Sequence, residues 1–426
     1  MLYRRGAMYK MKYLAATILF LVSGFHAFSE NQPQLIIGNS GEPATLDPHK
    51  YNLRLEETLL NDLFLGLTTF NAQVEITPGA AKSWNVSKDG LTWQFDLRRD
   101  LKWSDGTTLD AHDFVFSFRR LQDPETAASL SYFLYMIKNA EAINRGKKAR
   151  VSLGVRAKTP QTLIIELEKP YPYLLERLLY PTGFPVPKHT IEKFGEDWIK
   201  PENWVSNGAF RLTGWNPQEQ ITLEKNGYFH EEVSIQSASY VPVVSEQSGV
   251  NRFRTKDLHA IASFPAGEIV NLQKSRPNDL RMSDLLSMIY LVFNTQQVQT
   301  KDLKVRKALS LAIDQDIITQ KVLRNGSKSA FSFVPSLVSK YTPAKLPHLN
   351  LDKDERLNQA IKLLNSAGYN HETPLTLTLR HAAGAENKKV NLSIMGMWKR
   401  IGVNTSCLLY TSPSPRDQRG SRMPSS

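Results

Sequence analysis

The chain is almost free of cysteine, since Cys407 is the only one among 426 residues. A single thiol has no partner within the chain, so intramolecular disulfides are excluded and hydrophobic cores must hold the fold together. Hydrophobic residues make up 41% of the chain, which is enough for sizeable cores, and the length predicts two or three domains. No segment after residue 29 has the ~20 consecutive apolar residues that a membrane-spanning helix requires.

The motifs of common hydrolases are also missing. The sequence contains no Gly-x-Ser-x-Gly, no Ser-x-x-Lys and no His-Glu-x-x-His. Its nine histidines are dispersed, and the closest pair, His371 and His381, lacks the spacing of metal ligands. We therefore expect no catalytic residues, no metal and no cofactor. A secreted hydrolase is the alternative from another class, because an acid pair can also form only in three dimensions.

The formal net charge of +12 does not identify an anionic partner. Lysine and arginine are scattered among acidic residues, and no basic stripe interleaved with aromatic residues is present. We therefore expect no nucleic-acid partner and interpret these charges as a solvated surface.

The first 29 residues have the pattern of a cleavable export signal. A short apolar run over 13–25 follows four basic residues, Arg4, Arg5, Lys10 and Lys12. Ala27-Phe28-Ser29 supplies a small-x-small cleavage site, which predicts a mature protein that starts at Glu30. The alternative, a membrane anchor, is disfavoured because the run is shorter than a span. We expect a periplasmic protein without stable membrane insertion and, lacking a nearby cysteine, without an attached lipid.

The segment from Ser83 to Gly106 has the clearest local pattern. Lys88-Asp89-Gly90 predicts a turn, and Thr92–Leu97 alternates as a strand, with three apolar side chains on one face, Trp93, Phe95 and Leu97. A second turn, Ser104-Asp105-Gly106, precedes Asp110, which is predicted to cap a helix. The buried stripe of that helix consists of Phe114, Phe118 and Leu121.

Strand-like and helix-like segments alternate along the rest of the chain. The predicted strands are 35–38, 163–167, 209–212, 221–223, 240–244, 287–294 and 375–379. The predicted helices are 55–67, 173–179, 249–256, 303–313, 355–367 and 389–400. This mixed order indicates an α/β fold (mixed α+β), and no fixed internal period indicates repeats.

These segments, in this order, closely resemble the bacterial extracellular solute-binding proteins of family 5, the peptide receptors of ABC importers. The resemblance rests on the Ser83–Gly106 unit and on short motifs before and after it. These motifs are Gly41-Glu42-Pro43, Leu46-Asp47-Pro48-His49, Asp62–Leu67, Pro78–Ala81, Pro185–Lys188, Ile191–Gly195, Asn207–Phe210, Leu303–Asp316 and Lys362–Tyr369.

The resemblance implies a two-lobed, periplasmic binding protein type II-like fold with an extra inserted domain and an incomplete last domain. The implied boundaries are 1–29 for the signal peptide, 30–64 and 189–288 for domain I, 65–188 for the domain II insertion, 289–405 for domain III and 406–426 for a tail. We interpret that tail, rich in Ser, Pro and Arg, as non-native sequence joined to a truncated gene. Because the truncation removes part of domain III, we expect this chain to fold or to bind its ligand less well than the full-length protein.

The implied function is a monomeric receptor that captures oligopeptides in an interlobe cleft and delivers them to a membrane permease. An extended peptide offers a regular row of backbone amides, so pairing with strand edges gives affinity without side-chain selection. A cell-wall (murein) peptide or dipeptide receptor of the same family is the alternative.

The family pattern assigns five residues to the ligand. Asn52, Leu53 and Arg54 correspond to a domain I edge beside the peptide, although they could form only a loop before a helix. Tyr290 corresponds to an aromatic side chain that faces the cleft, and Tyr132 to a less certain one. On sequence alone, the apolar surroundings of Tyr290 favour a core position. Apolar Val292 stands where the family has an acid, which puts selectivity for basic peptide side chains in doubt.

Overall fold

The computed structural model describes residues 34–335, 338, 341, 342, 344, 351–381 and 385–409. The chain divides between Phe264 and Pro265 into two compact units, named unit 1 and unit 2 here. The predicted signal peptide and residues 410–426 lie outside the described residues.

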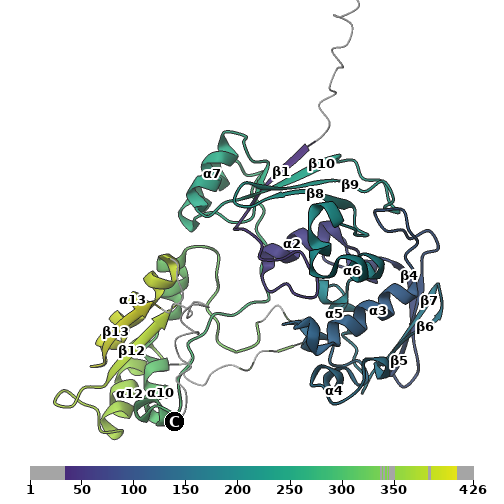
Figure 1. Cartoon of the computed structure of the whole chain (residues 1–426). Coiled ribbons are helices and arrows are strands. Elements are labelled where there is room, and N and C mark those ends of the chain that lie inside the picture. Colours follow the sequence, from purple (N-terminus) through teal and green to yellow (C-terminus); the bar gives the residue numbers. More distant parts are fainter. Residues whose placement is uncertain are drawn as a thin grey trace, which may run out of the picture. The chain divides into compact units, whose positions relative to one another are not determined.

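Unit 1 contains a five-stranded sheet in the order β11-β1-β10-β9-β8 (Figure 1). Its strands are β1 (Gln34–Asn39), β8 (Phe210–Asn216), β9 (Gln220–Lys225), β10 (Ser237–Pro242) and β11 (Ala260–Ile261). The first strand runs parallel to β10 and β11, while β8 and β9 form an antiparallel hairpin. The strands predicted over 35–38, 209–212, 221–223 and 240–244 are therefore confirmed, with shifted ends.

A second, antiparallel sheet of unit 1 has the order β4-β5-β7-β6. Its strands are β4 (Ala81–Val86), β5 (Thr92–Leu97), β6 (Val155–Thr159) and β7 (Thr162–Glu166). The predicted alternation of β5 is confirmed, because Trp93, Phe95 and Leu97 are all buried. Asp110 caps α3 (Ala111–Gln122) by accepting a hydrogen bond from the backbone of His112 at 2.7 Å, as the sequence predicted.

The remaining elements of unit 1 are short. They are strands β2 (Thr68–Phe70) and β3 (Ile76–Pro78), helices α2 (Arg54–Leu63), α4 (Ala140–Asn144), α5 (Leu174–Arg177), α6 (Lys188–Phe194) and α7 (Glu246–Arg254), and 3₁₀ turns η1 (Pro124–Thr126), η2 (Ser131–Leu134), η3 (Arg150–Ser152), η4 (Pro181–Gly183), η5 (Gly195–Ile199) and η6 (Pro201–Asn203). One continuous hydrophobic core includes residues of both sheets, such as Phe95 and Leu223. The predicted boundary between domains I and II stays a prediction.

The Asn207-Gly208 motif fixes the end of α2. The Asn207 side chain bonds both backbone groups of Leu65, accepting from its N–H at 3.1 Å and donating to its carbonyl at 2.9 Å. Gly208 donates its N–H to the carbonyl of Leu63 at 2.9 Å. The sequence predicted a helix that ends at Leu67, but α2 ends at Leu63. Asn207 and Gly208, far along the chain, bind the backbone at Leu65 and Leu63, and the C-cap residue Phe64 is extended.

Replacing Gly208 by alanine is expected to destabilise unit 1 by about 1–3 kcal/mol. A Cβ atom at Gly208 would lie 2.4 Å from the carbonyl carbon of Leu63 and 2.5 Å from the backbone nitrogen of Phe64, and backbone atoms cannot move aside easily. Gly227→Ala is the matched control, because its Cβ would meet no heavy atom within 4 Å. Urea denaturation of both variants measures the difference; equal stability would contradict the packing argument.

Unit 2 has its own core. Its elements are η7 (Ala266–Glu268), α8 (Ile269–Ser275), α9 (Val298–Lys301), α10 (Leu303–Leu311), α11 (Gln315–Ile317), the π-helix η8 (Ile318–Leu323), α12 (Lys353–Ser366), β12 (Thr376–His381), α13 (Ala385–Lys399) and β13 (Asn404–Leu409). The inward face predicted for 303–313 is confirmed, since Val305, Leu309 and Ala312 are buried. For 355–367 the prediction is wrong at Ile361, which is 37% exposed. The last strand pairs in parallel with β12 and continues past Thr405 to Leu409.

The prediction of a strand over 287–294 is wrong. This segment pairs with no other strand among the described residues. Its side chains do alternate, because Leu291 and Phe293 pack on the unit 2 core while Tyr290 and Val292 are 59% and 79% exposed. An apolar, β-branched run predicts an extended conformation, but a strand also needs a hydrogen-bonding neighbour, which the pattern cannot supply.

Candidate functional site

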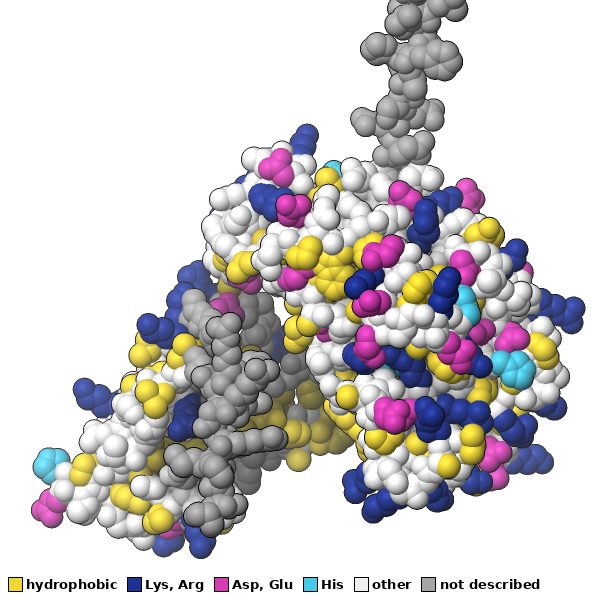
Figure 2. All heavy atoms as spheres, in the orientation of Figure 1, with side chains coloured by type: hydrophobic (Ala, Val, Ile, Leu, Met, Phe, Trp, Pro, Cys, Tyr) yellow, Lys and Arg dark blue, Asp and Glu magenta, His cyan; other side chains and the backbone are white. Residues whose placement is uncertain are grey.

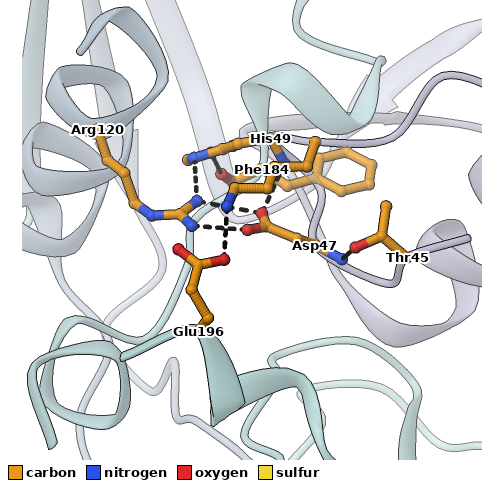
Figure 3. A network of polar contacts seen from close by, with 7 residues as sticks. Thr45, Asp47, His49, Arg120, Phe184 and Glu196 are labelled. Atoms are coloured by element: carbon orange, nitrogen blue, oxygen red, sulfur yellow. Dashed lines mark hydrogen bonds and ion pairs between the residues drawn. The ribbon is translucent and has the colours of Figure 1, made fainter. Parts of the chain in front are cut away.

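The loop between β1 and α2 is held by a buried polar network in unit 1. Arg120 of α3 donates to Asp47 through both terminal nitrogens, at 2.6 and 3.1 Å. It also contacts His49 Nδ1 at 2.9 Å, and His49 Nε2 lies 3.3 Å from the carbonyl oxygen of Phe184. Figure 3 shows these groups converging from three separate stretches of chain. Asp47 and His49 are 2% and 1% exposed, so the network is closed to solvent.

The charges in this network are compensated internally. Burial lowers the pKa of His49 to about 3, helped by the neighbouring Arg120 charge, so the ring is neutral at pH 7. The neutral ring then accepts from Arg120 at Nδ1 and donates to Phe184 at Nε2. Burial would raise the pKa of Asp47, but the charge and hydrogen bonds of Arg120 outweigh it and lower that pKa. These contacts hold the loop between β1 and α2 against α3 and the backbone of Phe184.

Glu56 fixes the other end of the same loop. Its buried carboxylate accepts backbone N–H groups from Ala44 at 2.9 Å, Asn52 at 2.8 Å and Leu53 at 2.9 Å. Sequence reasoning missed Glu56, although an acid three residues after an N-cap is a known signal for such a bond. Because Glu56 uses the N–H groups of Asn52 and Leu53, these two amides are not free to pair with a ligand in this conformation.

The end of this loop and the first residue of α2 present three predicted ligand-binding residues at the surface. Asn52 and Arg54 are exposed, and Leu53 is 50% exposed. Burial raises the pKa of the nearby Glu57, while the charge of Arg54 opposes this shift, so Glu57 partly balances the arginine. We call Asn52, Leu53 and Arg54 the rim segment.

An aromatic cluster brings Tyr132 near the rim segment. Tyr132 is 54% exposed and lies edge-on to Phe133, with ring centroids 4.9 Å apart, and Phe133 contacts Tyr180 at 5.2 Å. Burial raises the pKa of Tyr51, and the charges of Glu57, Tyr180 and Tyr132 add to this shift. Tyr132 and Tyr180 therefore lie close to Tyr51, the residue that directly precedes Asn52.

Tyr290 belongs to unit 2, and the core position favoured by its sequence context is wrong. Its ring is 59% exposed and its centroid lies 5.5 Å from that of Phe333. Val292, at the position of the family acid, is exposed as well. Both side chains are available for contact with another molecule.

The structure also forms one Asp–His pair that the sequence did not indicate. His189 Nε2 lies 2.8 Å from Asp105 Oδ2 at a pocket of about 220 Å³. The only hydroxyl among the lining residues belongs to Thr190, which is buried, and no lining residue carries a thiol. The pair therefore lacks an exposed nucleophile of the kind that Ser-His-Asp or Cys-His catalysis requires.

The residues that the structure describes offer neither a metal site nor a membrane-spanning helix. No three His, Cys, Asp or Glu side chains in them gather in a way that could hold a metal ion. None of their helices has the length and apolar character needed to cross a membrane.

The structure thus combines a mixed α/β fold, two separate hydrophobic cores and an exposed rim segment. The family model described as bacterial extracellular solute-binding proteins, family 5 Middle, matches residues 75–422, and the chain belongs to this family. Its members are solute-binding receptors. The match extends past Thr405, and the proposed foreign origin of residues 406–426 stays a prediction.

Individual relatives agree with this family. The periplasmic oligopeptide-binding protein OppA of Salmonella typhimurium is 36% identical over 87% of this chain and 69% of its own. The structure of the murein tripeptide binding protein MppA of Escherichia coli superposes with a TM-score of 0.81 and 35% identity, covering 91% of this chain and 77% of MppA. Haemophilus influenzae OppA in complex with the peptide RPPGFSPFR superposes at 0.80 with 32% identity, covering 89% and 76%.

Proposed function

We propose that this protein is an exported receptor that captures oligopeptides and delivers them to the membrane permease of an ABC importer. The observation that carries the proposal is its likeness to OppA along nearly the whole described chain, including a relative whose structure holds a peptide. Residues 1–29 would direct export to the periplasm and then be removed.

Within this proposal the rim segment contacts the peptide through side chains. Glu56 already binds the backbone N–H groups of Asn52 and Leu53. The polar groups offered to the ligand are therefore the side-chain amide of Asn52 and the guanidinium of Arg54. Tyr132 and Tyr290 supply exposed aromatic surfaces that accept many side chains. This division favours broad recognition, because aromatic contacts and bridging water do not select one sequence. The interlobe cleft stays a prediction.

Isothermal titration with mixed tri- to pentapeptides tests the proposal, and saturable binding is expected. Arg54→Gln should weaken binding by about tenfold to a hundredfold, since a hydrogen bond from a charged group contributes roughly 1.5–3 kcal/mol. Arg211→Gln is the matched control, because this exposed arginine on β8 lies outside the rim segment. Mass spectrometry after binding should recover intact peptides.

Three results would count against the proposal in different ways. Absence of saturable heat with every peptide would reject a peptide ligand. Recovery of peptide fragments would favour the hydrolase alternative. A strong preference for a murein tripeptide over ordinary tripeptides would select the cell-wall peptide receptor instead.

A further inference from the structure

Residues 138–158 of unit 1 form a strongly basic surface. This stretch contains one acid, Glu141, and seven bases, Lys138, Arg145, Lys147, Lys148, Arg150, Arg156 and Lys158, all of them exposed. Figure 2 shows Lys and Arg side chains gathering over the region where Figure 1 labels α4, β5 and β6. The sequence interpretation of scattered charges is therefore incomplete, because this one stretch of chain carries seven bases and a single acid.

Acidic neighbours neutralise only part of this surface. Arg145 pairs with Glu141 at 2.6 Å, and Arg150 pairs with Asp123. Lys138 and Arg156 share a single carboxylate, that of Glu166, at 3.3 and 3.7 Å. The other three bases, Lys147, Lys148 and Lys158, have no acidic partner among the described residues; Lys148 donates to the side-chain oxygen of Asn139. The surface thus keeps a clear positive excess.

The backbone holds these bases outward. On β6, an edge strand, the buried Val155 alternates with the exposed Arg156 and Lys158. Lys147 and Lys148 lie in the loop before η3, directly after Gly146, whose φ of +70° makes the turn. Val151, in η3, is 72% exposed among the charges. Lysine on an edge strand also protects against aggregation, but this does not account for the two loop lysines.

We propose that this basic surface docks unit 1 on a bilayer that contains anionic phospholipids. A cluster of basic residues with an exposed apolar side chain between them is the combination that binds the interface of such membranes. A single-stranded nucleic acid is disfavoured, because residues 138–158 include no aromatic side chain on which bases could stack. Docking would concentrate the receptor near the membrane, where a permease receives the ligand.

Co-sedimentation with vesicles tests the proposal. Lys147→Gln, Lys148→Gln and Lys158→Gln together should lower partition onto vesicles of 70% phosphatidylcholine and 30% phosphatidylglycerol by about tenfold or more, since each base near an anionic surface contributes severalfold. The corresponding triple arginine variant should bind like the unchanged chain. Raising the salt concentration to 0.5 M should abolish the difference between variants.

The matched control replaces three exposed lysines outside this surface, Lys82, Lys88 and Lys274, by glutamine. Variant and control keep the apolar N-terminal segment, so its own membrane binding cancels, and vesicles of phosphatidylcholine alone should not distinguish them. Equal loss in the control, or no loss in the patch variant, would overturn the proposal. Selective loss of binding to soluble polyglutamate or oligonucleotide, with vesicle binding unchanged, would overturn it in favour of an acidic protein or a nucleic acid.

Discussion

Replacing Arg120 by leucine is expected to lower the free energy of unfolding by about 3–5 kcal/mol. The change leaves the carboxylate of Asp47, which is 2% exposed, without its bidentate partner, and removes the donor to His49 Nδ1. An unpaired buried charge loses its hydration without compensation, so the loss exceeds that of an ordinary hydrogen bond. Urea denaturation followed by circular dichroism measures the change.

Arg211→Leu provides the comparison for this prediction. Arg211 also pairs with a carboxylate, that of Glu224 at 3.0 Å, but both side chains are about half exposed. Exposed pairs contribute about 0–1 kcal/mol, so this variant should be nearly as stable as the unchanged chain. If the two leucine variants lost equal stability, burial of the Arg120 network would not be the cause.

Acidification is expected to destabilise unit 1 well above the pH range in which carboxylates titrate. The pKa of His49 is about 3 in the folded protein and 6.5 in the unfolded chain, so between these values only the unfolded chain binds the proton. The stability contributed by the neutral ring is present above pH 6.5 and is lost as the pH falls toward 3. The slope approaches about 1.4 kcal/mol per pH unit in this window.

Asp47 adds a second, more acidic loss of stability. Its pKa is lowered below 3.8 in the folded state, so its contribution is present above pH 3.8 and disappears as the pH falls further. The stability contributed by His49 is therefore lost at a higher pH than the stability contributed by Asp47 as the solution is acidified. Between pH 6.5 and 4 the histidine dominates this part of the profile.

His49→Gln isolates the histidine effect. A glutamine amide can accept from Arg120 and donate to the Phe184 carbonyl, but it does not titrate. The free energies of unfolding of the unchanged chain and of this variant, measured from pH 7.5 to 4, should therefore converge or cross as the pH falls. Parallel profiles would show that His49 is not the group responsible.

Local features of this fold were predictable because neighbouring residues encode them. The turn at Lys88-Asp89-Gly90, the buried face of β5 and the cap at Asp110 depend only on nearby chain. Likewise, Gly368 ends α12 with a φ of +88°, which few residues other than glycine adopt readily. The family resemblance assigned the rim segment to an edge beside the peptide, and this role stays a prediction.

Other features depend on partners far apart in sequence. The Asp47–Arg120 pair joins residues 73 positions apart in the sequence. Asn207, whose side chain binds the backbone of Leu65 just after α2, lies 142 positions beyond Leu65. The apolar run at 287–294 was predicted as a strand, yet no part of the chain that the structure describes pairs with it. Glu56 binds the backbone N–H groups of Asn52 and Leu53, which the family resemblance had assigned to the ligand.

The sequence by itself determined the class of fold, the turns, the caps and the buried faces, since these follow from backbone preferences and periodicity. Only the tertiary structure decided which buried polar groups pair, where helices end against distant chain, and which bases of the stretch 138–158 have an acidic partner. The physical reason is that burial and charge compensation are properties of a residue's surroundings in space, which its neighbours in sequence do not specify.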